Sequence, residues 1–201
     1  MTHIGHSEKV FIVKRLLLIL ILTINFQSLT KADDIRDFEI EGISIGDNLL
    51  DYFTQDQIDN NNSRANFKDK SLQGLLFQDI DFIVNYDAMQ FVYKVKDMKI
   101  VNITALDKTG EDIKLCKKKK DKVVLDLDNI FAGIEKVDHE TKHPADNTGN
   151  SKVTSTFFNF KNGDFVAIEC EHWSKEMGYP NFLKISLRTN FYNKFLIKEY
   201  D

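Results

Sequence analysis

Alternating hydrophobic and polar residues predict strands in two stretches of the N-terminal half. Residues 38–45 (FEIEGISI) alternate, which is typical of a short strand or an extended lead-in. After a polar loop at 59–63, residues 75–105 alternate again over a much longer stretch. One face of these later strands is expected to be apolar and to carry Met89, Phe91, Tyr93, Val95, Val101, Ile103 and Ala105.

Apolar residues at helical spacing predict helices. Gly46-Asp47 offers a helix start, with Leu49, Leu50 and Phe53 on one apolar face. The longest helix is expected over residues 111–132, with Gly133 as its stop, although alternation in VLDLD (124–128) also permits a strand. Its core-facing stripe has spacings of seven, four, three and four and comprises Cys116, Val123, Leu127, Ile130 and Ile134.

The clearest local structure is a hairpin over residues 153–170. Asn162-Gly163 is the preferred pair for a two-residue type I′ turn. That turn sets a register with four opposed pairs, namely Lys161 with Asp164, Phe160 with Phe165, Phe158 with Ala167 and Phe157 with Ile168. Residues 182–187 predict another strand, and Thr189 is expected to cap a last helix whose inward residues are Phe191, Phe195 and Leu196.

The order of these elements predicts an α+β fold, with an antiparallel sheet and two or three packed helices. A helix followed by antiparallel strands occurs twice, so the order also permits two helix-plus-strands half-units, with chance similarity as the simpler interpretation. The length of 201 residues suits one domain, and 42% hydrophobic residues are enough to build a core. Disorder along the whole chain is therefore excluded as an interpretation.

The N-terminal residues have the order of a secretory signal peptide. Lys14 and Arg15 precede the apolar run 16–24, and a polar stretch then leads to Ala32. We expect residues 1–32 to be a signal peptide, with 1–12 a wrongly assigned start, and residues 33–201 to be a single domain in the periplasm or secreted. The run is too short to span a bilayer, so no stable membrane insertion is expected after cleavage, and an uncleaved anchor is the alternative.

Net charge limits the classes of partner, and the cysteine count predicts a disulfide. Removing residues 1–32 takes away four basic residues and one acidic residue, which changes the net charge from −4 to −7. Such an acidic domain is not an electrostatic match for nucleic acid or anionic lipid. Cys116 and Cys170 are the two cysteines, and in an oxidising compartment they suggest one disulfide, with two buried free thiols as the alternative.

One segment matches a metal-binding motif. His139, Glu140 and His143 fit H-E-x-x-H, in which two histidines on one helix face bind zinc and the glutamate activates water. Pro144 disfavours helical geometry at His143, and turn-rich residues follow. We therefore expect an exposed loop, without catalytic residues, metal or other cofactor; a zinc-dependent hydrolase using this segment is the alternative.

Two further segments attract attention. Four successive lysines at 117–120 encircle most of a helix turn, which predicts a solvated helix surface. His172, Trp173 and Tyr179 form an aromatic segment beside Cys170 that is a candidate binding surface. A core tryptophan packed against the disulfide is the alternative. Ser174 and His172 do not form a nucleophilic pair, because the chain has no G-x-S-x-G elbow.

Three pieces of the chain carry a resemblance to a known family. They are the leader followed by residues 38–52 (FEIEGISIGDNLLDY), His143-Pro144 with Gly149-Asn150-Ser151, and the two cysteines with Trp173. Together they resemble an uncharacterised family of small exported proteins from bacteria with compact, AT-rich genomes. The resemblance implies export and pairing of the two cysteines, and implies no activity.

The order of helix and strands is also similar to that of SmpA/OmlA-like periplasmic modules with a β-lactamase-inhibitor-protein fold. Those modules are adaptors or inhibitors, so this likeness favours binding over catalysis. The sequence therefore predicts an exported binding or accessory protein without catalysis of its own. Its partner is an unidentified protein or small-molecule ligand.

Overall fold

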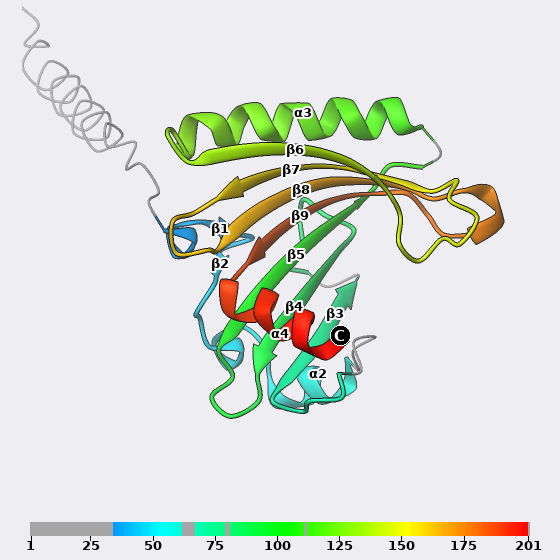
Figure 1. Ribbon diagram of the computed structural model, residues 1–201. Coiled ribbons are helices and arrows are strands. Elements are labelled where there is room, and N and C mark those ends of the chain that lie inside the picture. The colour runs from blue at the N-terminus through cyan, green and yellow to red at the C-terminus, as the bar shows by residue number, and fades with distance from the viewer. Residues whose placement is uncertain (1–33, 62–66, 79–80, 111, 201) are drawn as a thin grey trace, which may run out of the picture. The chain divides into compact units, whose positions relative to one another are not determined.

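A seven-stranded antiparallel sheet organises the part of the chain that the computed structural model describes, residues 34–61, 67–78, 81–110 and 112–200 (Figure 1). The order in the sheet is β3-β4-β5-β9-β8-β7-β6. The strands are β3 (Leu72–Gln78), β4 (Ala88–Lys94), β5 (Ile100–Lys108), β6 (Glu135–Lys142), β7 (Lys152–Asn159), β8 (Phe165–His172) and β9 (Phe182–Arg188). The predicted α+β class is confirmed. The expected signal peptide lies outside the described residues.

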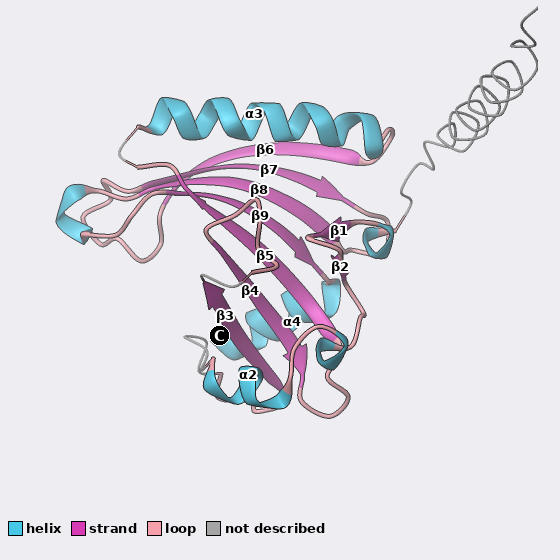
Figure 2. Cartoon of the chain, turned by 180° about the vertical axis from the view of Figure 1, so that it is seen from behind, coloured by secondary structure: helices cyan, strands magenta, loops and turns pink. Residues whose placement is uncertain are grey.

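Helices lie on both faces of the sheet. The longest, α3 (Ile113–Ile130), runs over β8 and β9 on one face, here called the first face. The C-terminal helix α4 (Asn190–Tyr200) lies beside β5 on the second face (Figure 2). The short helix α2 (Gln55–Asn60) and a two-stranded hairpin of β1 (Glu39–Ile40) and β2 (Ile43–Ser44) precede the sheet.

The main hydrophobic core fills the space between the first face and two covering layers. One layer is α3, and the other is the N-terminal segment 35–58. Phe53 of this segment stacks on Phe77 of β3, with 4.1 Å between the ring centroids. A smaller cluster under α4 on the second face comprises Phe67, Leu72, Val92, Val101 and Tyr192. Most of the apolar surface is thus buried on the first face.

A bulge in β5, where Val101 has no partner on β4, changes which residues of β5 face the core. Val92 pairs with Asn102 and Tyr93 pairs with Ile100, so the register shifts between these pairs. Ile103 and Ala105 lie in the main core as predicted, whereas Val101 lies under α4 on the other face. The alternation in the sequence hides this shift because a bulge inserts one residue without changing the apolar pattern.

The N-terminal segment differs from its prediction. The predicted helix at Gly46-Asp47 is replaced by a 3-10 turn, Leu49–Asp51, and Leu50 is 46% exposed rather than on a core face. The helix α2 begins only after Thr54, whose hydroxyl accepts from the amide of Gln57 while the Gln57 side chain accepts from the amide of Thr54. This capping box sets the helix start because it satisfies two amides that have no partner within the helix.

The central helix α3 confirms its predicted position and excludes a strand there. Asp112 caps it by accepting a hydrogen bond from the amide of Lys114. Cys116 and Leu127 are buried, and Val123 and Ile130 pack against the core. Gly133 lies three residues beyond the helix end with a φ of 85°, a left-handed conformation that favours glycine.

The lysine run on α3 is not uniformly solvated, so that prediction is wrong for Lys120. Lys120 is buried, and its Nζ donates to Thr156 Oγ1 at 2.6 Å. Lys117 lies 3.7 Å from Glu140 on β6, and Lys119 pairs with Asp107 at 2.6 Å. The run therefore ties α3 to the polar strands beneath it.

The hairpin of β7 and β8 occurs where predicted, but its register is shifted by one residue. Phe158 pairs with Val166 and Phe157 pairs with Ala167. The loop has three residues, 161–163, because the amide of Phe160 donates to the carbonyl of Asp164. Within that loop only Gly163 has a positive φ, which fits a turn with a glycine bulge rather than a type I′ turn.

A contact from outside the hairpin accompanies this register. Asp164 is buried and its Oδ1 accepts from the amide of Asn190, the first residue of α4, at 2.8 Å. Pairing Asp164 with Lys161 on the hairpin edge would remove this contact. The expected charge pair is therefore absent and the aspartate binds the start of α4 instead.

The last helix confirms its cap and corrects its buried face. Thr189 Oγ1 accepts from the amide of Tyr192 at 3.1 Å. Tyr192 packs inward, while Phe191, predicted to be buried, is 48% exposed.

The two helix-plus-strands units of the predicted order have three strands and four strands, and they join in one sheet where β5 pairs with β9.

Candidate functional site

The disulfide predicted from the sequence is present and positions the site. Cys116 on α3 is bonded to Cys170 on β8, with 5.9 Å between the Cα atoms. Both side chains are fully buried. Because Cys170 lies two residues from the end of β8, the bond holds α3 next to the point where the chain leaves the sheet.

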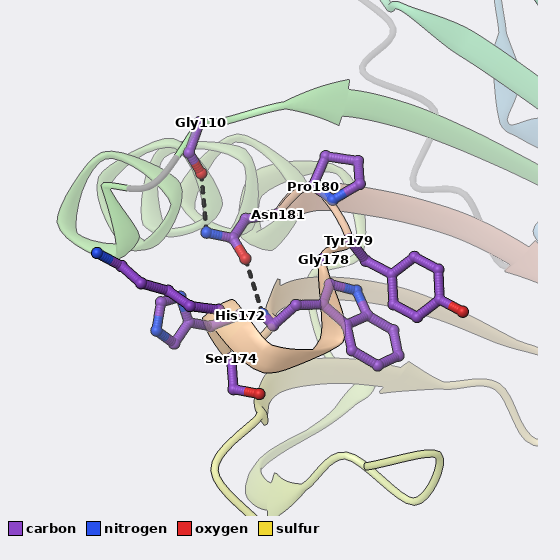
Figure 3. Close-up of a pocket in the computed structure, with 9 residues that line it drawn as sticks. Gly110, His172, Ser174, Gly178, Tyr179, Pro180 and Asn181 are labelled. Carbon is purple, nitrogen blue, oxygen red and sulfur yellow. Dashed lines mark hydrogen bonds between the residues drawn. The ribbon is translucent and has the colours of Figure 1, made fainter.

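The side chain of Asn181, the last residue of the aromatic loop (residues 173–181, between β8 and β9), joins the two ends of this loop and ties it to the end of the β5 segment. Its Oδ1 accepts from the amide of Trp173 at 2.7 Å, and its Nδ2 donates to the carbonyl of Gly110 at 2.8 Å (Figure 3). Gly178, with a φ of 67°, ends a 3-10 turn, Lys175–Met177, inside the loop. These contacts fix the loop without burying it.

The three residues proposed from the sequence as a binding surface line one hollow. His172, Trp173 and Tyr179 contribute to a cavity of about 650 Å³ on the outer side of the aromatic loop. His172 and Tyr179 point to opposite sides of the loop (Figure 3). Trp173 is half-buried, so it is not the core tryptophan of the alternative interpretation, and Tyr179 is 58% exposed.

The inner side of the aromatic loop borders a second hollow, here called the groove. The groove has a volume of about 630 Å³ and lies on the second face, where Trp173, Tyr179 and Pro180 meet the sheet. Strand residues line its floor: Leu76, Gln78, Gln90, Leu106, Lys108, Glu171, Phe182 and Lys184. Glu171 and Phe182 flank the aromatic segment that the sequence marked, whereas sequence reasoning missed the others, because they come from separate strands and no local pattern marks them.

Two charged side chains of the groove form an ion pair, and a histidine lies beside it. Lys184 Nζ donates to Glu171 Oε1 at 2.5 Å, and His143 Nε2 lies 3.7 Å from the same carboxylate oxygen. The His143 ring also packs on Trp173, with 3.8 Å between ring centroids. Trp173 in turn contacts Tyr179, at 4.9 Å between centroids. A chain of contacts therefore runs from the sheet to the exposed tyrosine.

Asp146 joins the two loops that flank the groove. Its carboxylate accepts from both the amide and the hydroxyl of Thr148, from both those of Ser151, and from the Ser174 hydroxyl. These bonds, above all that from the Ser151 side chain, hold the pKa of Asp146 well below its ordinary value of 3.8. The carboxylate thus ties the β6–β7 loop, which carries His143, to the aromatic loop.

The HETKH segment lies on a strand rather than a loop, which corrects its placement. His139, Glu140 and Thr141 belong to β6, and His143 follows that strand. Successive strand side chains point to opposite faces, so His139 contacts Phe157 while Glu140 faces Lys117 and Lys152. His143 is not exposed as a loop histidine would be, because its side chain is 14% exposed and its Nε2 lies 3.7 Å from the Glu171 carboxylate. Among the described residues, no three histidine, cysteine or acidic side chains are grouped to hold a metal ion.

Comparison with other proteins provides no further guide. No protein-family model, curated protein or solved structure matches this chain. Within the described part of the chain, no helix has the length and apolar character needed to cross a membrane. The functional argument therefore rests on the residues of the groove and its surroundings.

Acid should loosen the groove through Asp146. Because its pKa is lowered by folding, its contribution to stability is complete above about pH 4 and falls as the pH drops toward the folded-state pKa. We expect Asp146→Asn to lower the unfolding midpoint at pH 7 by several degrees and to reduce the loss of stability between pH 4 and pH 2. Thermal unfolding at several pH values measures both effects.

Asp126→Asn is the control, since Asp126 pairs only with exposed Lys122 on α3. An acid dependence identical in wild type and Asp146→Asn would contradict the proposed linkage between the two loops.

Proposed function

We propose that this chain is an exported binding protein without catalysis of its own, and that its ligand occupies the groove. The observation that carries the proposal is the exposed Tyr179 ring beside a floor that carries polar side chains; this ring contacts Trp173, which in turn packs on His143. A site of about 630 Å³ lies within the range of small-molecule sites, about 300–1,000 Å³. Export is supported by the signal-peptide order of residues 1–32.

The chemistry of the groove favours a saccharide. A sugar ring has a face of C–H groups that packs on an aromatic ring, and an edge of hydroxyl groups that needs hydrogen-bonding partners. Tyr179 supplies the ring, and Gln78 and Gln90 supply amides that both donate and accept. The lining holds two lysines and one glutamate, and Lys184 is paired with Glu171, so Lys108 leaves a net charge of only +1, which suits a ligand without strong charge.

The tryptophan provides a direct readout of this site. Trp173 is the single tryptophan of the chain and lines both hollows beside the aromatic loop, so its fluorescence reports on ligand binding at this loop. We expect titration with a β-1,4-linked N-acetylglucosamine tetrasaccharide to change this fluorescence in a saturable way. Tyr179→Ala should weaken binding at least tenfold, because it removes the exposed stacking surface.

Tyr52→Ala is the matched control, since Tyr52 is also an exposed tyrosine and lies outside the groove. Its affinity for the tetrasaccharide should equal that of the wild type. Absence of a saturable change with the tetrasaccharide, or equal affinity in Tyr179→Ala and wild type, would refute the proposal.

A further inference from the structure

A hollow of different character lies at the other end of the second face. It has a volume of about 520 Å³, and its lining includes Lys70, Leu72, Lys94, Val95, Lys96 and Phe191. These residues come from the start of β3, the end of β4 and the first turn of α4. The groove is bordered instead by the ends of β3 and β5, about 20 Å away along the strands.

Two large apolar side chains are exposed at this hollow. Phe191 is 48% exposed and Val95 is 45% exposed, above the buried Leu72. The core under α4 does not use Phe191, because Tyr192 and Phe195 already pack on Phe67 there. The exposed pair therefore contributes little to folding, and its exposure to water requires a separate explanation.

The same surface concentrates positive charge in an acidic chain. Residues 67–72, 94–99 and 190–200 contain seven lysines and three acidic residues, whereas the whole chain has a net charge of −4. The three acids bind backbone amides: Glu199 those of Lys68 and Asp69, Asp69 that of Ser71, and Asp97 that of Lys99. Among the described residues lining the hollow, none is acidic, and Lys94 Nζ lies 4.5 Å from the centre of the Phe191 ring.

We propose that this basic apolar face, defined by Lys70, Lys94, Val95, Lys96 and Phe191, docks on an anionic bilayer surface. Phe191 and Val95 enter the boundary between headgroups and acyl chains, and the lysines contact anionic headgroups while their alkyl stems cover apolar surface. The charged lining consists of lysines, whose ammonium groups are point charges on long stems, which suits a surface of many headgroups better than one ligand of fixed shape. The net negative charge of the chain disfavours anionic lipid as a partner for the domain as a whole. The lysines nevertheless concentrate attraction on this one face while the acidic remainder is repelled, so the field turns this face toward the membrane.

The basic apolar face and the groove are separate surfaces. The hollow lies at the beginning of β3 and the groove at its end, and the two share no lining residue. The inference does not require the groove to bind a saccharide. The saccharide titration and the vesicle experiment therefore test the two proposals independently.

Sedimentation with lipid vesicles tests the inference, using the native protein. We expect binding to vesicles of equal parts phosphatidylglycerol and phosphatidylcholine, little binding to pure phosphatidylcholine, and weaker binding as salt is raised. The double variant Lys94→Glu/Lys96→Glu should bind the anionic vesicles at least tenfold more weakly, and Phe191→Ser several-fold more weakly.

The controls lie on α3, on the first face of the sheet. Lys114→Glu/Lys118→Glu reverses two exposed charges there, and Leu125→Ser removes a side chain that is 64% exposed. Both should bind as the wild type does, and all variants should keep their thermal transition. Equal binding to neutral and anionic vesicles would overturn the inference, as would wild-type binding by the Lys94/Lys96 variant or equal loss in the α3 controls.

Discussion

Replacing both Cys116 and Cys170 by alanine should lower the free energy of unfolding by roughly 4 kcal/mol. This is the free energy that the loss of chain entropy predicts for a closed loop of this size. The disulfide joins residues 54 positions apart and so restricts a large part of the unfolded chain. It also links α3 to the sheet at the point from which the aromatic loop leaves. Most of the loss should therefore appear as destabilisation of the whole domain.

Urea unfolding in the presence and absence of a reducing agent measures this effect. Reduction should destabilise the wild type by a similar amount and leave the double alanine variant unchanged, which makes the variant its own control. Thiol titration of the unfolded, unreduced wild type should find no free thiol. An unfolding curve of the wild type that does not respond to reduction would contradict the prediction.

Phe131→Ala should lower the free energy of unfolding by about 3–5 kcal/mol, the usual cost of removing a buried phenylalanine. Phe131 is fully buried at the end of α3, and its ring contacts Phe38 from the N-terminal segment and Phe158 and Phe160 from the β7–β8 hairpin. The cavity would separate three parts of the chain that are distant in sequence. Its cost should be high because backbone elements on all sides limit how far the site can close.

Phe191→Ala is the matched control for this substitution. Phe191 is exposed on α4, and its removal should change the free energy of unfolding by less than about 0.5 kcal/mol. Urea unfolding of both variants provides the comparison. Equal stability of the two variants would show that the ring cluster around Phe131 is not a cooperative part of the core.

Elements with strong local signals were predictable from the sequence. The helix α3 has a capping aspartate, an apolar stripe and a glycine after its end, and each of these acts within a few residues. The strands β4, β5 and β9 alternate because one of their faces is buried in the main core. The disulfide followed from residue type, because two cysteines are expected to pair in an oxidising compartment.

Elements without such signals were missed or misplaced. The strand β6 has exposed side chains along almost its whole length, so no alternation marks it, and its backbone pairing with β7 alone makes it a strand. Val101 and Phe191 were placed on the wrong face for a related reason. The bulge at Val101 in β5 and the packing of Tyr192 turn them there, and neither is visible in a local apolar pattern.

Part of the candidate site was visible in the sequence, and part of it only in the structure. Trp173 and Tyr179 were visible in the sequence as one aromatic segment, and the structure places both on one loop. The floor of the groove was not visible, because strand pairing brings together residues from β3 to β9. Asp146 was overlooked as well; the turn-rich residues that follow it were its only signal.

By itself, the sequence determined the fold class, the long helix, the hairpin position, the cysteine pair and the aromatic segment. Each depends on interactions between near neighbours or on residue type alone. The tertiary structure decided the hairpin register, the edge strand, the groove and the basic apolar face. These depend on contacts between residues tens of positions apart, such as Asp164 with Asn190 and Lys94 with Phe191. Their free energy is gained only when the sheet assembles, so no short stretch of the chain records them.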